Sequence, residues 1–240
     1  MKRISLKNIK LGYKSKRNQT NVVSKNLNVE FIGGKINVII GESGCGKTTI
    51  LRAISGLISP LEGSVYFDDV DVTKYDPSNR GLSYVSQMIG LYSNLSVFNN
   101  IAFPLKVSHT PSDEIRERVQ EVAEMLKIEH LLSRKPRELS IGQAQRVALA
   151  RAIIKRSIVY LLDEPFSNLD KKTSIELIQE LKQLFSRLNA TVIFVSHDVG
   201  EALSFADQVY AMHEGNIIFS GTPEQILLET DERITRLLKN

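Results

Sequence analysis

The segment 41–48 constrains this chain more than any other part of its sequence. It reads GESGCGKT and matches the pattern G-x-x-x-x-G-K-[ST] in full. A short apolar run precedes it at 36–40, and a helical pattern follows at 49–55. Glycines allow such a loop to wrap a phosphate group with its backbone N–H groups turned inward, and the following helix adds the positive end of its dipole. The segment therefore predicts a strand, a phosphate-binding loop and a helix in succession.

The residues of this loop have separate expected roles. Lys47 is expected to reach the β- and γ-phosphates of a nucleotide, and the Thr48 hydroxyl to ligate Mg²⁺. Cys45 is interpreted as a small loop residue rather than a nucleophile, in a neighbourhood electropositive enough to make its thiol reactive. The alternative, a glycine-rich turn without a ligand, is disfavoured by the flanking strand and helix. The residues of this segment predicted to bind ATP are Gly41, Glu42, Ser43, Gly44, Cys45, Gly46, Lys47, Thr48 and Thr49.

A second apolar run, at 158–162, ends in two carboxylates, Asp163 and Glu164. Ligands of open α/β sheets bind at the carboxyl ends of the strands. Asp163 is expected to hold Mg²⁺, directly or through water, and Glu164 to orient and polarise the attacking water, because phosphoryl transfer depends on positioning and charge neutralisation. Two acids at the end of a strand are often only a solvated strand end. Together with the phosphate loop they predict hydrolysis of a nucleotide.

The apolar patterns predict an α/β fold with a P-loop NTPase core sheet. The runs at 36–40, 158–162 and 191–195 are typical of buried parallel strands, and helical patterns lie between them. The alternating segment 64–67 favours antiparallel strands at one edge. Residues 88–139 are rich in helical pattern and lack apolar strand runs. We therefore expect an ATP-binding core formed by 1–87 and 140–240, with 88–139 as an inserted helical subdomain and a signature segment at its end.

Further motifs follow in a fixed order along the chain. They are YVSQ at 84–87, LSIGQ at 139–143, SNLD at 167–170 and VSHD at 195–198. Alone, Gln87 would be a surface glutamine and His197 a structural histidine at a strand end. With the phosphate loop and the acidic pair, these motifs make the chain similar over nearly its whole length to the ATP-binding subunit of an ABC transporter.

The resemblance implies a role for each motif. Gln87 would touch Mg²⁺ and water and sense a membrane partner, and His197 would contact the γ-phosphate. The implied catalytic residues are Glu164, His197 and Gln87, and the implied metal-binding residues are Thr48, Gln87 and Asp163. Tyr13 is similar in placement to the aromatic residue that stacks on adenine. Ser140, Gly142 and Gln143 would complete the γ-phosphate site of the opposite subunit at the start of a helix near residue 143. Two chains would thus enclose two MgATP molecules as a homodimer or pseudo-dimer.

One residue departs from the family pattern. The chain has Ile141 where the signature usually has glycine. If the backbone there required a positive φ, a β-branched residue would be strained. The expected consequence is a mild effect on how tightly the dimer closes.

The composition limits the classes of partner that the chain is expected to bind. A net charge of +4 is too small to indicate nucleic acid, and one cysteine excludes an intrachain disulfide. No stretch has the roughly 20 apolar residues of a membrane helix.

The segments around 91–103, 201–203 and 221–224 resemble subunits of sugar and polyamine importers, although a chain ending at Asn240 has no room for the regulatory domain of many sugar importers. We therefore expect a peripheral ATPase on the cytoplasmic face of the membrane that powers solute import through integral-membrane subunits. An exporter ATPase and an ABC ATPase not coupled to transport are the alternatives.

Overall fold

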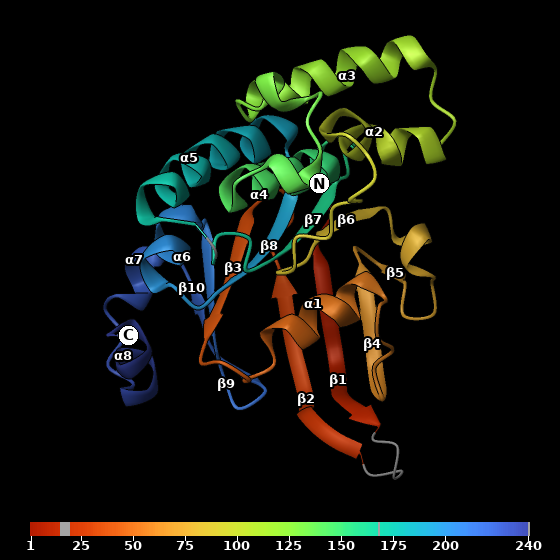
Figure 1. Cartoon of the computed structure of the whole chain (residues 1–240). Helices are drawn as coiled ribbons and strands as arrows, with labels where there is room; N and C mark the ends of the chain where they lie inside the picture. Colours follow the sequence, from red (N-terminus) through yellow and green to blue (C-terminus); the bar gives the residue numbers. More distant parts are fainter. Residues whose placement is uncertain (15–19, 168, 240) are drawn as a thin grey trace.

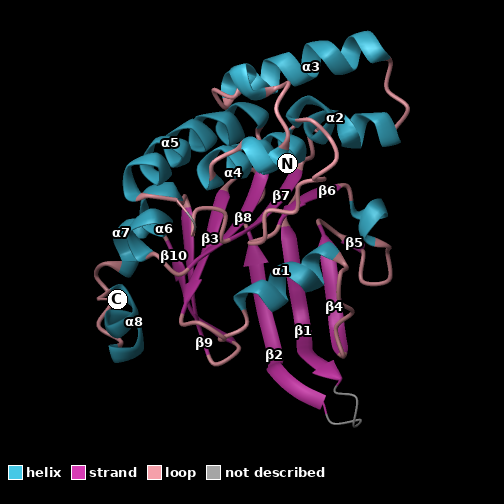
Figure 2. Ribbon diagram, in the orientation of Figure 1, coloured by secondary structure: helices cyan, strands magenta, loops and turns pink. Residues whose placement is uncertain are grey.

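The chain folds into two sheets with helices between and beside them (Figures 1 and 2). We describe it from a computed structural model, over residues 1–14, 20–167 and 169–239. The larger sheet has six strands in the order β10-β9-β3-β8-β7-β6. In chain order these are β3 (Ile36–Gly41), β6 (Leu82–Val85), β7 (Val159–Asp163), β8 (Thr191–Ser196), β9 (Gln208–His213) and β10 (Asn216–Gly221). Neighbouring strands are parallel except β9 and β10.

The smaller sheet is antiparallel and has the order β2-β1-β4-β5. Its strands are β1 (Ile4–Lys14), β2 (Thr20–Phe31), β4 (Glu62–Phe67) and β5 (Val70–Asp71). The expected antiparallel strands are therefore present, but as a separate sheet rather than as an edge of the core sheet. Helix α1 (Lys47–Ser55) lies between the two sheets, because its apolar side chains share one buried cluster with strands of both.

The remaining helices cover the other face of the large sheet or follow its last strand (Figure 1). They are α2 (Val97–Val107), α3 (Ser112–Met125), α4 (Ile141–Ile153), α5 (Lys171–Leu188), α6 (Val199–Phe205), α7 (Pro223–Ile226) and α8 (Glu232–Leu238). Single 3₁₀ turns lie at η1 (Pro77–Arg80), η2 (Glu129–Leu131) and η3 (Pro136–Glu138). Among the described residues, no helix is long and apolar enough to cross a membrane.

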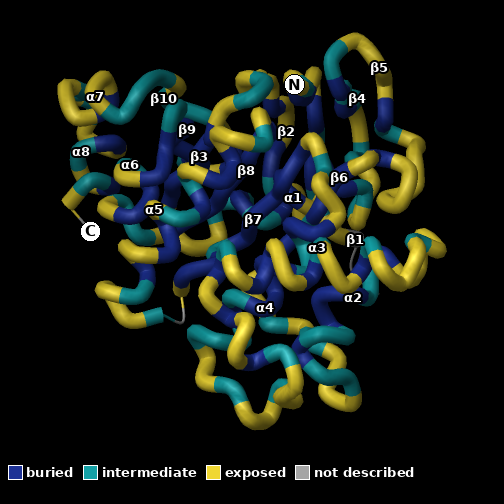
Figure 3. Tube along the Cα trace, turned by 90° about the horizontal axis from the view of Figure 1, so that it is seen from above, coloured by how far each residue is buried: buried dark blue, intermediate teal, exposed yellow. Residues whose placement is uncertain are grey.

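Two buried clusters use opposite faces of the central strands. In β3, Val38 and Ile40 pack toward the helices, whereas Ile39 packs toward α1 and the small sheet. All residues of β3, β7 and β8 are buried, as expected for parallel strands covered on both sides (Figure 3). Continuous apolar runs predicted these strands to within one residue of their observed ends. Ile158 belongs to the predicted run but not to the strand, because it precedes β7 and is exposed.

Residues 88–139 contain α2, α3 and two 3₁₀ turns and no described strand. Side chains from α2 and α3 share their buried cluster with α4, β7 and β8. The helical character of this segment agrees with the expectation. Its boundaries as a subdomain stay a prediction.

Candidate functional site

The phosphate loop joins the end of β3 to the start of α1. Gly44 and Gly46 have φ values of 81° and 114°, which explains why glycine stands at both positions. A Cβ on Gly46 would lie 2.7 Å from Val23 Cγ1, so the close approach of β2 also requires glycine. No side chain caps the start of α1. The first N–H groups of this helix are thus available to an anion, as they are in phosphate sites.

Lys47 places a positive charge inside this loop. Its side chain is buried, and its Nζ donates to the carbonyl oxygens of Gly41 at 2.7 Å and Glu42 at 3.0 Å. Lys47 forms no ion pair with any described residue. Carbonyl groups orient the ammonium without neutralising its charge, so it can bind a phosphate oxygen.

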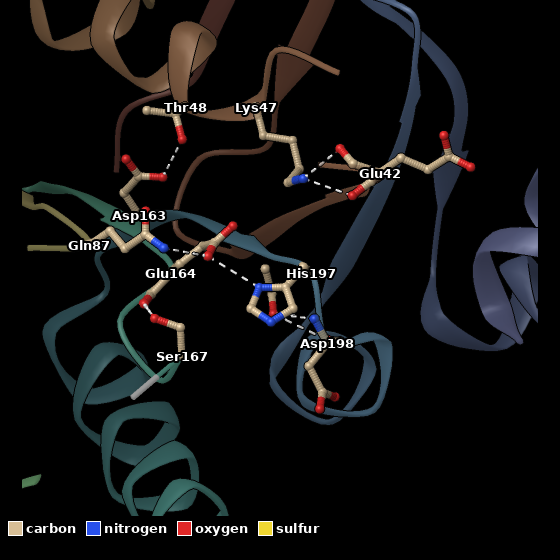
Figure 4. A network of polar contacts seen from close by, with 11 residues as sticks. Glu42, Lys47, Thr48, Gln87, Asp163, Glu164, Ser167, His197 and Asp198 are labelled. Atoms are coloured by element: carbon tan, nitrogen blue, oxygen red, sulfur yellow. Dashed lines mark hydrogen bonds and ion pairs between the residues drawn. The ribbon is translucent and has the colours of Figure 1, made fainter. Parts of the chain in front are cut away.

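Asp163, the last residue of β7, faces the start of α1. Its Oδ1 accepts a hydrogen bond from the Thr48 hydroxyl at 2.8 Å (Figure 4). Its Oδ2 accepts one from the Tyr84 hydroxyl at 2.9 Å. Burial, followed by the charge of Asp163, raises the pKa of Tyr84 well above its usual value. Tyr84 therefore stays protonated and donates to the carboxylate. Sequence reasoning missed Tyr84, although it is in the strand that leads to Gln87.

Glu164 lies at a sharp turn directly after β7. Its φ is 48°, which is uncommon for a residue with a side chain, and its N–H donates to the Val195 carbonyl at 3.0 Å. Its Oε2 accepts a hydrogen bond from Gln87 Nε2 at 3.0 Å and lies 3.1 Å from His197 Nδ1 (Figure 4). The structure thus brings together Glu164, Gln87 and His197 from three separate segments.

These groups surround one cleft of about 530 Å³. Its lining includes the phosphate loop, Gln87, Glu164, His197 and Tyr13. The Tyr13 hydroxyl lies 3.1 Å from Thr49 Oγ1, which ties this aromatic ring to α1. Asn21 and Val23 of β2 also line the cleft and were not anticipated. Asn21 is opposite Tyr13 in the β1–β2 pair, so only the strand register reveals its position.

The signature segment begins α4. The N–H of Gln143 donates to Ser140 Oγ at 3.3 Å, and the Gln143 side chain accepts from the Ser140 N–H at 3.0 Å. Ser140, Gly142 and Gln143 are not among the described residues that line the 530 Å³ cleft. Within one chain, the signature residues therefore do not line the cleft that contains the phosphate loop. The helix begins at Ile141, two residues before the expected start.

Two expectations for single residues change. Ile141 is the first residue of α4, 61% exposed, and is absent from the residues with positive φ. The suspected backbone strain is therefore not present in this structure. Burial raises the pKa of the Cys45 thiol although Lys47 acts to lower it, so the thiol is not activated as its electropositive neighbourhood suggested. Asn168, in the motif at 167–170, lies outside the described residues.

Comparisons with known proteins identify the family of this chain. The family model described as "ABC transporter" matches residues 24–167. The sn-glycerol-3-phosphate import ATP-binding protein UgpC of Yersinia enterocolitica is 44% identical over 85% of this chain. The trehalose/maltose import ATP-binding protein MalK of Thermococcus litoralis is 43% identical over 84% of this chain. The chain spans 56% of the length of each of these relatives.

Solved structures give the same result. The dimeric structure of MJ0796, a bacterial ABC transporter cassette, has a TM-score of 0.83 and 31% identity, and the match covers 92% of this chain and 98% of that one. A post-hydrolysis state of the same cassette, bound to ADP and Pi, matches equally well. The family model covers more than half of the chain, and the motifs of the site lie in the expected order. The chain belongs to the ABC transporter family.

Proposed function

We propose that this chain is an ATP-hydrolysing subunit that powers solute import through separate membrane-spanning subunits. The observation that carries the proposal is the Glu164 carboxylate, held between Gln87 and His197 beside the phosphate loop. A carboxylate in that position can orient a water molecule toward the terminal phosphate of a nucleotide.

ATP binding follows from the lining of the cleft. The proposed binding residues are those of the phosphate loop with Thr49, together with Tyr13, which also lines the cleft. The Tyr13 ring offers a face on which adenine can stack, and the uncapped start of α1 offers N–H groups to the phosphates. Lys47 would turn its ammonium from the two loop carbonyls to the β- and γ-phosphates.

The oxygen atoms of the site suit Mg²⁺. Thr48 Oγ1 and Asp163 Oδ1 are 2.8 Å apart, and Gln87 lines the same cleft. No described cluster of three acidic, histidine or cysteine side chains forms a complete metal site. That agrees with Mg²⁺, which takes few protein ligands and completes its shell with phosphates and water. Bound here by Thr48, Asp163 and Gln87, Mg²⁺ would neutralise charge on the phosphates.

The catalytic roles belong to residues near Glu164 Oε2. Glu164 would accept a hydrogen bond from the attacking water, and His197 would donate one to the γ-phosphate. Gln87 would hold both the carboxylate and the water in line. These side chains supply position and charge rather than a covalent intermediate, as phosphoryl transfer requires.

A second copy would complete the site. Ser140 and Gly142 stand at the start of α4, whose first residue, Ile141, is exposed, and they do not line their own chain's cleft. A helix start with a serine hydroxyl is suited to bind the γ-phosphate of the partner. The matched cassette structure is itself described as dimeric. We therefore propose a head-to-tail homodimer or pseudo-dimer around two ATP molecules.

A groove beside Gln87 is suited to a membrane subunit. It has about 310 Å³ and is lined by residues of β6, α2 and α4, including Met88, Tyr92 and Arg151. Met88 is 83% exposed, and the Tyr92 and Phe103 rings pack at 4.5 Å. The lining of this groove includes Ser86 and Met88, the two neighbours of Gln87, so a membrane partner bound there can act on the site through Gln87. On this proposal the chain is peripheral, on the cytoplasmic face of the membrane, and 88–139 is the helical subdomain that supplies part of the groove.

Import is favoured over export because the two relatives described above are named as import ATP-binding proteins. The coupling proposal can be tested by co-purifying the chain with its membrane subunits. Tyr92→Glu should lose these subunits, because it removes the aromatic ring that lines the groove and packs against Phe103. Leu228→Glu is the matched control, since Leu228 is 81% exposed and lies outside the groove. Equal recovery with both variants would contradict the assigned groove.

A further inference from the structure

The loop that carries His197 is short and lies at the surface. His197 is the residue between the end of β8 at Ser196 and the cap of α6 at Asp198. Its side chain is about half exposed, so little packing surrounds the imidazole. The direction of the ring therefore depends on how the backbone on either side is held.

Asp198 holds this backbone by several hydrogen bonds. Its N–H donates to Ser196 Oγ at 3.0 Å, and its Oδ1 accepts from the Glu201 N–H at 2.8 Å, which caps α6. Both contacts are local to the β8–α6 connection. They fix the loop relative to the end of β8 and the start of α6.

Lys171 supplies a contact from outside this connection. Lys171 is the first residue of α5, directly after the motif at 167–170, and its Nζ donates to Asp198 Oδ2 at 3.0 Å. The hydrogen bond to Asp198 raises the pKa of Lys171. Desolvation acts to raise the pKa of Asp198, but hydrogen bonds from the Glu201 N–H and from Lys171 outweigh it, so the pKa of Asp198 is lowered. Both side chains line a small cleft of about 260 Å³ that also contains Glu164 and His197.

A second contact runs parallel to the first, one turn further along both helices. The Ser174 hydroxyl donates to Glu201 Oε1, and both residues are buried. Lys171 and Ser174 are three residues apart on α5, as are Asp198 and Glu201, so each pair lies on one helix face. The first turn of α6 is thus braced against the first turn of α5 at two points.

Resting on the function proposed above, we infer that Lys171 is a positioning residue that orients His197 toward Glu164 through Asp198. The cation links the segment after the 167–170 motif to the histidine loop within one chain. Because the pair is partly exposed, with side chains 62% and 38% exposed, its expected contribution is modest. It should affect turnover rather than ATP binding or global folding.

The first test measures steady-state ATP hydrolysis by the wild type and single variants. Lys171→Met should lower kcat about threefold to fivefold, as expected for loss of an exposed ion pair, with KM for ATP unchanged. Lys171→Arg should restore most of the loss. Lys172→Met is the matched control, because Lys172 is the next residue and forms no ion pair with the described part of the chain; it should retain wild-type kcat.

A double-variant cycle tests the route through Asp198. Asp198→Asn keeps an N-cap side chain but removes the charge. If Lys171 acts through Asp198, the combined variant should be no slower than Asp198→Asn alone. Additive losses, or a wild-type kcat for Lys171→Met in an active protein, would overturn the inference and leave the proposed ATPase intact.

A second measurement does not depend on turnover. The imidazole cross-peak of His197 in a histidine-labelled chain can be assigned by its absence in His197→Gln. Lys171→Met and Asp198→Asn should broaden or shift this peak, Lys171→Arg should restore it, and Lys172→Met should leave it unchanged. An inactive wild type would contradict the proposed function, while an unmoved peak in Lys171→Met would contradict the positioning role.

Discussion

Asp163 and Glu164 are neighbours in the sequence, yet their carboxylates face different parts of the site. Asp163 ends β7 with a strand conformation and faces Thr48 and Tyr84. The positive φ of Glu164 turns the chain, so that its side chain faces Gln87 and His197 instead. One change of backbone conformation separates a residue suited to a metal from a residue suited to a water molecule.

Lys47→Ala tests the phosphate loop at this scale. Removing the ammonium leaves the loop without the cation that lies between the Gly41 and Glu42 carbonyls. We expect ATP affinity to fall at least tenfold, roughly the 1.4 kcal/mol or more that a charge-assisted hydrogen bond contributes. Calorimetric titration with ATP measures this change. Lys35→Ala is the control, because Lys35 is exposed and lies outside the cleft. Unchanged affinity in Lys47→Ala would contradict the loop assignment.

The residues whose roles could be predicted from sequence are those that lie in contiguous motifs. The phosphate loop and the Asp163–Glu164 pair can be identified because strand, loop and helix follow one another directly. Tyr84 could not be assigned to Asp163 from local pattern, because the contact depends on β6 pairing beside β7, with Tyr84 opposite Leu161. Asn21 was missed for the same reason, since its place in the cleft depends on the β1–β2 register.

Helix starts carry much of the chemistry at the level of secondary structure. Asp170, Asp198 and Asp231 cap α5, α6 and α8 with their carboxylates, whereas α1 has no side-chain cap. Helix α3 also lacks a side-chain cap, so an open start alone does not mark a phosphate site; the open start of α1 matters because its first residues line the cleft. The Thr222–Gln225 capping box at the start of α7 is likewise formed by residues close in sequence.

The cap of α8 gives a pH prediction. The side-chain hydrogen bond from Arg233, followed by a backbone N–H, lowers the pKa of Asp231 from 3.8 to about 2. The folded state therefore binds this proton less tightly than the unfolded state. The stabilisation is fully present above about pH 4 and is lost as the pH falls through about 2. Asp231→Asn retains a cap but lacks the charge.

Hydrogen exchange of the α8 amides, measured for both proteins at each pH, tests this prediction. The wild type should be better protected than Asp231→Asn near neutral pH, and the difference should shrink toward pH 2. A difference that grows on acidification would contradict the assigned sign.

Substitutions of Ile141 test the conformation at the start of α4. Since Ile141 already begins the helix without a positive φ, glycine there relieves no strain and adds backbone freedom to the unfolded chain. We expect Ile141→Gly to lower the free energy of unfolding by up to about 1 kcal/mol in urea titrations. Ile141→Ala, which keeps a good helix former, should lose less. A higher turnover in the glycine variant alone would show that strain limits closure after all.

At the scale of the whole molecule, α1 lies between the two sheets, and its first residues line the cleft. The order of the six strands brings β3, β7 and β8 together at the centre, so their carboxyl ends carry Gly41, Asp163 and Ser196 to one edge. Apolar patterns in the sequence could predict individual strands. They could not predict that the antiparallel strands form a second sheet. That separation depends on long-range packing against α1.

In the proposed dimer, the signature helix serves the partner's site rather than its own. Its residues are absent from the cleft of the same chain, which is why the account requires a second copy. Dimer closure and hydrolysis are therefore linked: the pair of chains should be most stable when ATP is bound and cannot be cleaved.

The most direct test measures Mg²⁺-dependent ATP hydrolysis and molecular size for the wild type and Glu164→Gln. Glutamine preserves the shape of Glu164 but removes the charge that accepts from Gln87 and faces His197. We predict turnover in the wild type, a loss of at least a hundredfold in kcat for the variant, about 2.7 kcal/mol in the barrier, and an ATP-dependent dimer of the variant on size exclusion. Rapid hydrolysis by Glu164→Gln, or a variant that binds ATP yet stays monomeric, would contradict the account.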